Sequence, residues 1–171
     1  LSDLEVVSNE EQGKLWEISY KTDLGNIVVA TTRPETMLGD VAIAVNPNDK
    51  RYKKFINKKA FIPLINKEIP IIGDSYVDME FGTGCLKITP GHDFNDFEIG
   101  QKNNLPIINI MKKNGTLNSN VPKKFRSLSM LEARKKILKD LKESGDLISE
   151  KDHMITIPRS DRTGVTLEPF L

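Results

Sequence analysis

The sequence has very little of the residue types on which several classes of protein depend. Cys85 is the only cysteine, which excludes an internal disulfide and a cysteine-rich metal site and fits a reducing compartment. No apolar run approaches the roughly 18 residues of a membrane span, and the first residues lack the basic and apolar regions of a signal peptide. We therefore expect a cytoplasmic protein with no membrane partner.

The chain also lacks a strong net charge. Its 25 lysines and arginines nearly balance its 24 aspartates and glutamates, so the overall charge of +1 does not demand a nucleic-acid partner. A local exception is Lys50 to Lys59, which holds six cations and no acid. This segment is either a solvated helix face or a contact with an RNA backbone.

The length of 171 residues is enough for one domain with a sizeable core, and 38% hydrophobic content is ordinary for a globular protein. We expect a single domain over residues 1–171. Because the first residue is not methionine, we also expect a piece of a longer chain.

Predicted strands outnumber predicted helices. A hairpin is expected over 14–32 around the turn "TDLG", and further strands are expected at 41–45, 68–72, 85–89 and 105–110. Their irregular spacing favours an α+β fold, built on a mixed, partly closed β-sheet or barrel with peripheral helices.

The clearest predicted helix begins after Ser129, which forms a capping box with Glu132, and stops at Gly145. Its expected apolar stripe consists of Leu131, Ile137, Leu138 and Leu141.

The stretch "VVATTRPETMLGD", residues 28–40, leaves a strand through an unusual corner. Thr32 and Glu35 fit a capping box, with Pro34 in the first turn and Glu35 reaching back to the Thr32 amide. That structural interpretation leaves Arg33 and Thr36 unexplained. Free amides, a guanidinium and a hydroxyl at a helix start form a site for oxygen-rich or anionic groups.

A second constellation lies in "GTGCLKITPGHDFND", residues 82–96. In a strand, Lys87 and Thr89 share one face, and Asp93 and Asp96 then lie on one side of the first turn of a helix. Asp93 as a simple N-cap and Asp96 as an acid favoured by the helix dipole are the structural alternatives. The convergence of all four side chains on one strand end favours a site.

Other chemistries have weaker support. His92 with Asp93 and Asp96 is a poor metal pattern, so we predict no metal and no cofactor. Cys85 alternates with apolar strand residues and is expected to be a small packing residue.

Taken in order, the segments "ATTRPETMLGD", "NPND", "EIPII", "YVDMEFGTGCLKITPGHDFNDFEIG", "NLPIINI", "NGTLN" and "EARKKIL" resemble the editing domain of valyl-tRNA synthetases. The resemblance runs from about Thr31 to Leu171, and "GVTLEPFL" resembles the return to the catalytic core. The signatures of the activating core are absent, so the resemblance implies an excised editing domain that does not activate an amino acid.

The resemblance implies hydrolysis of threonine wrongly esterified to valine tRNA, with that tRNA and the parent catalytic core as partners. Such editing is needed because a hydrophobic pocket that accepts valine discriminates against threonine, which has nearly the same shape, by a factor of only about 10². This family is the standard example of that limit. By position, Asp96 would hold the substrate ammonium, and Asp93 and Lys87 would read the threonine side chain. The residues implied to line the pocket are Thr31, Thr32, Arg33, Thr36 and Thr89.

Three alternatives remain open at this stage. The domain could bind the tRNA acceptor end without cutting, it could edit for the related isoleucyl or leucyl enzymes, or it could be a metal-dependent hydrolase using His92. One departure from some valyl enzymes is visible, because Ser160 and Thr163 stand where those have a Cys-x-x-Cys pair.

Overall fold

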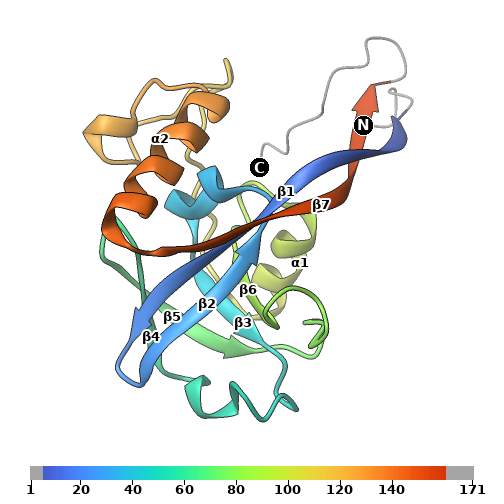
Figure 1. Cartoon of the computed structure of the whole chain (residues 1–171), viewed down its shortest axis with the longest axis vertical. Helices are drawn as coiled ribbons and strands as arrows, with labels where there is room; N and C mark the ends of the chain where they lie inside the picture. The colour runs from blue at the N-terminus through green and yellow to red at the C-terminus, as the bar shows by residue number, and fades with distance from the viewer. Residues whose placement is uncertain (1–5, 161–171) are drawn as a thin grey trace.

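The computed structural model describes the backbone of residues 6–160 and the side chains of residues 13–154 (Figure 1). Within this range, seven strands form one mixed sheet, and the only parallel pair joins β3 to β5. The strands are β1 (Val6–Thr22), β2 (Gly25–Thr31), β3 (Ala42–Val45), β4 (Lys59–Ile62), β5 (Lys67–Gly73), β6 (Cys85–Ile88) and β7 (Leu147–Ser160). The helices are the 3-10 helices η1 (Pro34–Gly39), η2 (Lys53–Phe55) and η3 (Lys123–Phe125) and the α-helices α1 (Phe94–Lys102) and α2 (Met130–Ser144).

The sheet curls until its two ends nearly meet. Its order is β2-β1-β4-β5-β3-β6, and the end strands β2 and β6 lie close together. Thr83 Oγ1 donates a hydrogen bond to the Val28 carbonyl (2.6 Å), which ties the loop before β6 to β2. Gly82 in that loop has φ +57°, and a Cβ there would lie 2.8 Å from Ala30 Cβ, so this close approach requires glycine. The predicted α+β fold with a mixed, partly closed sheet is confirmed.

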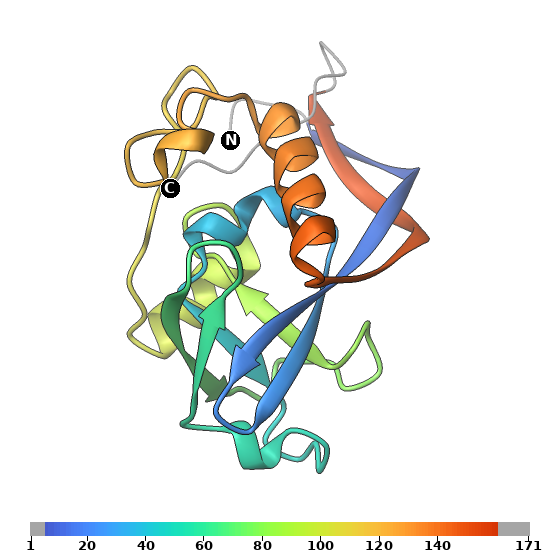
Figure 2. The same ribbon diagram turned by 60° about the vertical axis from the view of Figure 1, so that its left-hand side comes forward.

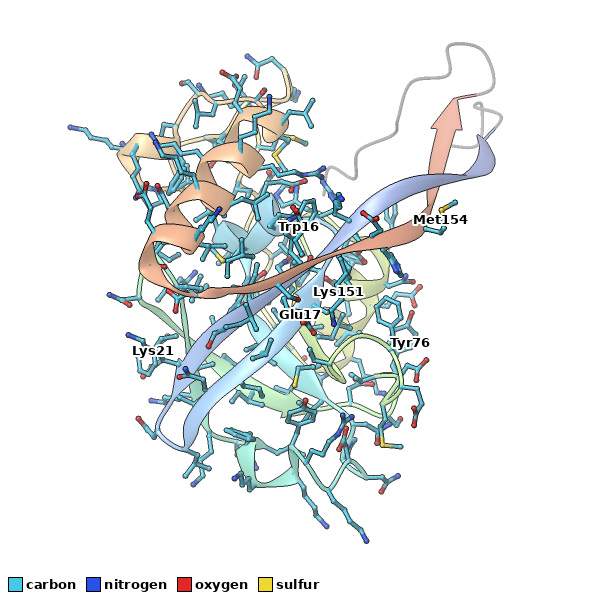
Figure 3. The ribbon with its side chains drawn as sticks, viewed as in Figure 1. Trp16, Glu17, Lys21, Tyr76, Lys151 and Met154 are labelled. Carbon is cyan, nitrogen blue, oxygen red and sulfur yellow. The ribbon has the colours of Figure 1, made fainter. Side chains whose placement is uncertain are left out.

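The hairpin predicted over 14–32 is confirmed as β1 and β2, with Thr22 paired to Gly25 at the turn. β1 extends further toward the N-terminus and pairs with β7 from Val6 to Ile18, and this two-stranded ribbon projects beyond the barrel (Figure 1). Lys151 Nζ lies 3.4 Å from Glu17 Oε1 across the ribbon (Figure 3). β7 was not predicted, because a ribbon that leaves the barrel has no wholly buried face and so lacks the alternation of a half-buried strand.

Two hydrophobic clusters stabilise the fold. The larger fills the barrel and extends to α2, with Tyr20 and Phe125 among its fully buried side chains. The smaller lies between the sheet and α1, where Ile88 of β6 packs near Ile99. Both faces of β6 are therefore covered.

α2 begins and ends as predicted. Ser129 and Glu132 form the capping box, and Gly145 adopts φ +82° at the C-cap. The buried stripe is Met130, Ala133, Ile137 and Leu141. Leu131 is 67% exposed, so its predicted place on that stripe is wrong. It lies about 120° around the helix from Ile137, since each residue advances the helix by about 100°.

The strands predicted at 41–45, 68–72 and 85–89 are confirmed as β3, β5 and β6. The strand predicted at 105–110 is wrong, because the Ile110 amide bonds to His92 Nε2 (3.0 Å) rather than to a neighbouring strand. β4, which follows the lysine-rich segment, was not predicted. None of the helices within residues 6–160 has the length and apolar character needed to cross a membrane.

Candidate functional site

The chain turns sharply between β2 and η1. Thr31 Oγ1 accepts a hydrogen bond from the Arg33 amide (3.0 Å), and this turn places Arg33 at the N-cap of η1. No described side chain caps that helix, so the predicted cap by Thr32 is wrong. The turn made by Thr31 starts the helix one residue later than the sequence pattern indicates. Pro34 lies in the first turn, as predicted.

Glu35 does not reach back to the Thr32 amide, as the capping box predicted. It is buried and receives two hydrogen bonds from Arg134 of α2, at 2.9 and 2.8 Å. Its Oε2 also lies 3.6 Å from Arg33 Nε, and Arg33 in turn donates to the His92 carbonyl (2.8 Å). Glu35 therefore joins α2 to the corner at which Arg33 is held. Figure 2 shows α2 beside this corner.

Lys87 is the centre of a buried polar network. Its Nζ lies 2.7 Å from Asp40 Oδ1, 2.7 Å from Thr36 Oγ1 and 2.6 Å from Thr89 Oγ1. An ammonium has three donors, so these three partners can use all of them. Lys87 is thus held in one position. It contributes a positive charge to the adjoining cavity but no N–H group that is free to donate a hydrogen bond to a substrate.

Asp40 and Tyr20 complete this network, and neither was predicted. Tyr20 donates to Asp40 Oδ2 (2.5 Å), and Thr89 donates to Asp40 Oδ1 (2.6 Å). Burial raises the pKa of Asp40, and the adjacent Lys87 ammonium opposes that rise. Burial and the Asp40 charge raise the pKa of Tyr20 well above its usual value, so Tyr20 stays a donor. One signal was available: an acid placed between the apolar runs of "MLGDVAIAV".

Two carboxylates meet at the start of α1. Asp93 is the N-cap and accepts the Asp96 amide (3.0 Å), while Asp96 Oδ2 accepts the Thr89 amide (2.9 Å). Burial, reinforced by the neighbouring Asp93, raises the pKa of Asp96 to about 7. Asp96 therefore favours a partner that brings a positive charge.

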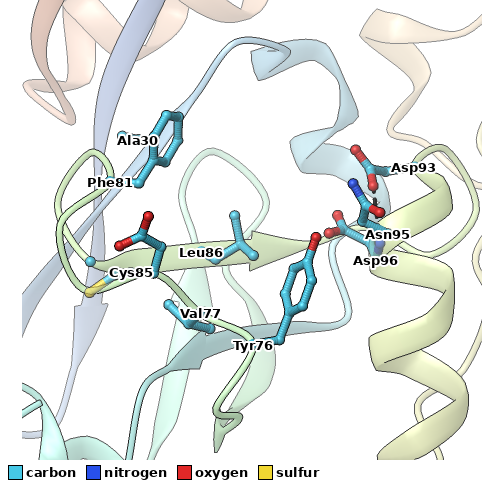
Figure 4. A pocket seen from close by; sticks show the side chains of 11 residues that line it. Ala30, Tyr76, Val77, Phe81, Cys85, Leu86, Asp93, Asn95 and Asp96 are labelled. Atoms are coloured by element: carbon cyan, nitrogen blue, oxygen red, sulfur yellow. Dashed lines mark hydrogen bonds between the residues drawn. The ribbon is translucent and has the colours of Figure 1, made fainter. Parts of the chain in front are cut away.

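Two adjoining cavities open around these groups. The smaller, of about 140 Å³, is lined by Leu15, Ala30, Thr31, Thr32, Arg33, Thr36, Phe81, Leu86, Lys87, His92, Asp93 and Asp96. The larger, of about 280 Å³, shares part of that lining and adds the aromatic ring of Tyr76. In Figure 4, Leu86 lies between Phe81 on one side and the Asp93–Asp96 pair on the other. The cavities combine aromatic and apolar walls with charged groups of both signs.

The structure brings the predicted site residues together. Of the eight, all except Thr89 line the smaller cavity, and Thr89 lies behind it as a partner of Lys87 and Asp96. Tyr76 and Phe81 were not predicted, although aromatic residues within the acidic stretch "SYVDMEF" were a visible signal. The structure shows both side chains to be exposed.

Two residues considered for other chemistry have structural partners. His92 is fully buried, and its Nε2 accepts the Ile110 amide (3.0 Å). Cys85 is buried in the larger core, and burial raises its pKa to about 12, so it is a packing residue and not a thiolate. Among the described residues, no group of three histidine, cysteine or acidic side chains is placed to hold a metal. The Ser160 side chain and all of Thr163 lie outside what the structure describes.

Comparisons with known proteins agree on one family. A family model described as "Leucyl-tRNA synthetase, editing domain" matches residues 48–142. The valine–tRNA ligase of Coxiella burnetii (strain RSA 493 / Nine Mile phase I) is 54% identical over 100% of this chain and 19% of its own length. That of Bacillus subtilis (strain 168) is 50% identical over 100% of this chain and 20% of its own. The chain thus spans about a fifth of the length of these relatives.

A solved structure shares the fold. It is agnB2 LeuRS of Agrobacterium radiobacter K84, in a ternary complex described as LeuRS-tRNA-LeuAMS, with a TM-score of 0.63. The match covers 86% of this chain and 20% of that one, at 18% sequence identity.

Proposed function

The chain belongs to the family of aminoacyl-tRNA synthetase editing domains, and on this premise we propose that it hydrolyses the ester joining threonine to valine tRNA. The domain would be one part of a longer synthetase, whose catalytic core and tRNA are its partners. Valine tRNA is favoured over leucine or isoleucine tRNA because the relatives at about 50% identity are valine–tRNA ligases.

The observation that carries this proposal is the meeting of Lys87 and the Asp93–Asp96 pair in one small cavity. An aminoacyl ester carries an ammonium beside its carbonyl group. The ammonium would lie against Asp96, whose raised pKa would fall once that positive charge is bound. Asp93, on the same wall, would accept the threonine hydroxyl.

Valine would fit this wall poorly. It has a methyl group where threonine has its hydroxyl, so the Asp93 oxygen that does not accept the Asp96 amide would lose its partner once the substrate excludes water. Such a loss costs about 1–3 kcal/mol. A site that requires a hydrogen-bonding partner rejects the analogue that lacks it more strongly than an apolar pocket can. The cavity would therefore supply the discrimination that an apolar valine pocket lacks.

The chemical step needs little catalytic assistance from the protein. An ester is already activated, so a positioned water, aided by the neighbouring ribose hydroxyl, would attack its carbonyl carbon. Negative charge then develops on the carbonyl oxygen. The fixed charge of Lys87 and the N-terminus of α1 would stabilise that oxygen without reorganising, because Lys87 is already held by three partners. When the negative charge returns to form the carbonyl again, the C–O bond to the ribose breaks, and the ribose oxygen takes up the proton that the water loses.

The direct test is release of threonine from Thr-charged valine tRNA by the 171-residue chain. We expect hydrolysis by the wild type and none by Asp96→Ala, because the substrate ammonium would lose its partner. Glu98→Ala, which removes an exposed carboxylate of α1 that lines neither cavity, is the matched control and should stay active. Binding of the charged tRNA without hydrolysis would instead indicate a non-catalytic insert.

A further inference from the structure

The cations of this nearly neutral chain are distributed very unevenly. Residues 112–142 contain ten of the 25 lysines and arginines but only two of the 24 acids. Their net charge is +8, so the rest of the chain carries −7. We call residues 112–142 the basic lobe.

The basic lobe is one compact part of the fold. Thr116 pairs with Ser129 in a β-bridge, which joins the hairpin around 111–117 to the start of α2. Lys136 Nζ donates to the Lys124 carbonyl (2.9 Å), which fastens η3 to the middle of α2. Figures 1 and 2 both show the 112–128 segment beside α2, at one end of the molecule.

The two acids of the lobe leave most of its positive charge uncompensated. Glu132 is used in the capping box, and Asp140 pairs with Lys124 at 3.1 Å. Six exposed lysines of the lobe have no ion-pair partner among the described side chains: Lys112, Lys113, Lys123, Lys135, Lys139 and Lys142.

Three of these lysines form a row on α2. Lys135, Lys139 and Lys142 follow the spacing i, i+4, i+7, so they share the side of the helix opposite its buried stripe. At 1.5 Å per residue the row is about 10 Å long. It is a linear array of cations suited to a linear array of phosphates.

The other lysine-rich segment, Lys50 to Lys59, is a weaker candidate in the folded chain. Arg51 pairs with Asp49 at 2.8 Å, and Lys59 pairs with Glu68 at 3.3 Å. Arg51 also donates to the Met79 carbonyl, which holds the segment against a loop carrying Asp78 and Glu80. Its positive field is therefore partly cancelled by neighbouring acids.

We propose that the basic lobe, and its α2 row above all, is a surface for the phosphate backbone of RNA. This proposal rests on the proposed function for the identity of the RNA, which is the body of the tRNA whose charged end enters the cavity. Phosphate contacts of this kind are independent of base sequence and release counterions, so the affinity they supply falls steeply with salt.

The test compares two triple variants of the 171-residue chain. The first is Lys135→Gln/Lys139→Gln/Lys142→Gln, and the matched control is Lys50→Gln/Lys53→Gln/Lys58→Gln. Each removes three exposed lysines without an ion-pair partner among the described residues, so net charge falls equally in both. Glutamine has nearly the helix propensity of lysine, so α2 should remain folded, which circular dichroism would check.

The measurement is the affinity for uncharged valine tRNA as a function of salt. For the α2 triple we expect the slope of log K against log salt to become less steep by about 2–3, since each phosphate contact contributes about 0.7–0.9. The control slope should change by less than about 1. Equal losses in both variants, a loss in the control alone, or no loss in either would overturn the proposal.

A second assay separates this proposal from the catalytic one. The threonyl ester of adenosine has no tRNA body, so its hydrolysis should be the same for the wild type and the α2 triple. If the wild type does not cleave this small ester but the α2 triple still weakens tRNA binding, the proposed hydrolysis fails while the RNA surface stands.

Discussion

Asp40 Oδ1 lies 2.7 Å from Lys87 Nζ, and both side chains are buried between β3, β6 and η1. A buried ion pair is costly to break, because removing one partner leaves the other charge uncompensated. We predict that Asp40→Asn and Lys87→Met each lower the free energy of unfolding by about 3–5 kcal/mol. The double variant should lose clearly less than the sum of the two.

Urea denaturation of the four proteins in this cycle gives the coupling energy. The exposed pair Lys14–Asp152 is the control, and Lys14→Met with Asp152→Asn should show coupling too small to resolve. Additive losses at Asp40 and Lys87 would mean that the two side chains do not act as a pair.

The raised pKa of Asp96 predicts a pH-dependent stability. An acid whose pKa is higher in the folded state than in the unfolded state adds stability below its unfolded pKa, near 3.9, and loses it as pH rises through about 7. Asp96→Asn mimics the protonated form, so it should be more stable than the wild type at pH 8 by up to a few kcal/mol. The difference should shrink toward pH 4.

Urea midpoints at pH 4, 6 and 8 measure this effect. Asp78→Asn removes an exposed carboxylate and should show no such trend. If Asp96→Asn is less stable than the wild type at pH 8, the carboxylate is stabilised by its surroundings, and the reasoning from burial is wrong.

The link from α2 to the cavity predicts an effect of Arg134 on activity. Arg134 holds Glu35, which lies beside Arg33, so Arg134→Met should lower kcat/KM through Arg33. In an Arg33→Ala background, Arg134→Met should lower kcat/KM little further, giving a coupling of about 0.5–3 kcal/mol. Arg134→Lys, which keeps the charge, should recover part of the loss. Fully additive effects would assign Arg134 a purely structural role.

Chelation should leave hydrolysis unchanged. His92 Nε2 is occupied by the Ile110 amide, and the described residues offer no three-ligand group. Threonine release should therefore be equal with and without EDTA. Loss of activity on chelation, restored by zinc, would support the alternative of a metal-dependent hydrolase that uses His92.

How much of this could be predicted from sequence depended on whether the signal was local. Each cap of α2, and likewise the hairpin turn, is formed by residues only a few positions apart, and all were predicted. Glu35 was misassigned because its partner, Arg134, is 99 residues away, and a local capping pattern cannot reveal a distant ion pair. The segment 105–110 has residues typical of a strand. Its Ile110 amide, however, bonds to the His92 side chain instead of making the main-chain hydrogen bonds of a strand pair.

The same distinction applies to the site. Lys87, Asp93 and Asp96 are close in sequence, so their convergence on one strand end was predictable. Tyr20 comes from β1, and Asp40 lies between η1 and β3. Asp40 meets both Lys87 and Tyr20 only in the folded barrel. Resemblance to a family indicated most of the polar residues that line the smaller cavity, but neither the aromatic residues Tyr76 and Phe81 nor the buried partners that hold the site.

The most direct measurement of the central claim is hydrolysis of Thr-charged and Val-charged valine tRNA by the wild type and by Asp93→Ala. The wild type should cleave the threonyl ester much faster than the valyl ester. Asp93→Ala should be slower on threonine and should lose much of that preference, because the partner of the threonine hydroxyl is gone. Asp93→Asn keeps a helix cap and separates loss of the cap from loss of the charge. If Asp93→Ala slows both esters equally and keeps the threonine preference, Asp93 is only a cap or a general catalytic group, and our account of specificity is contradicted.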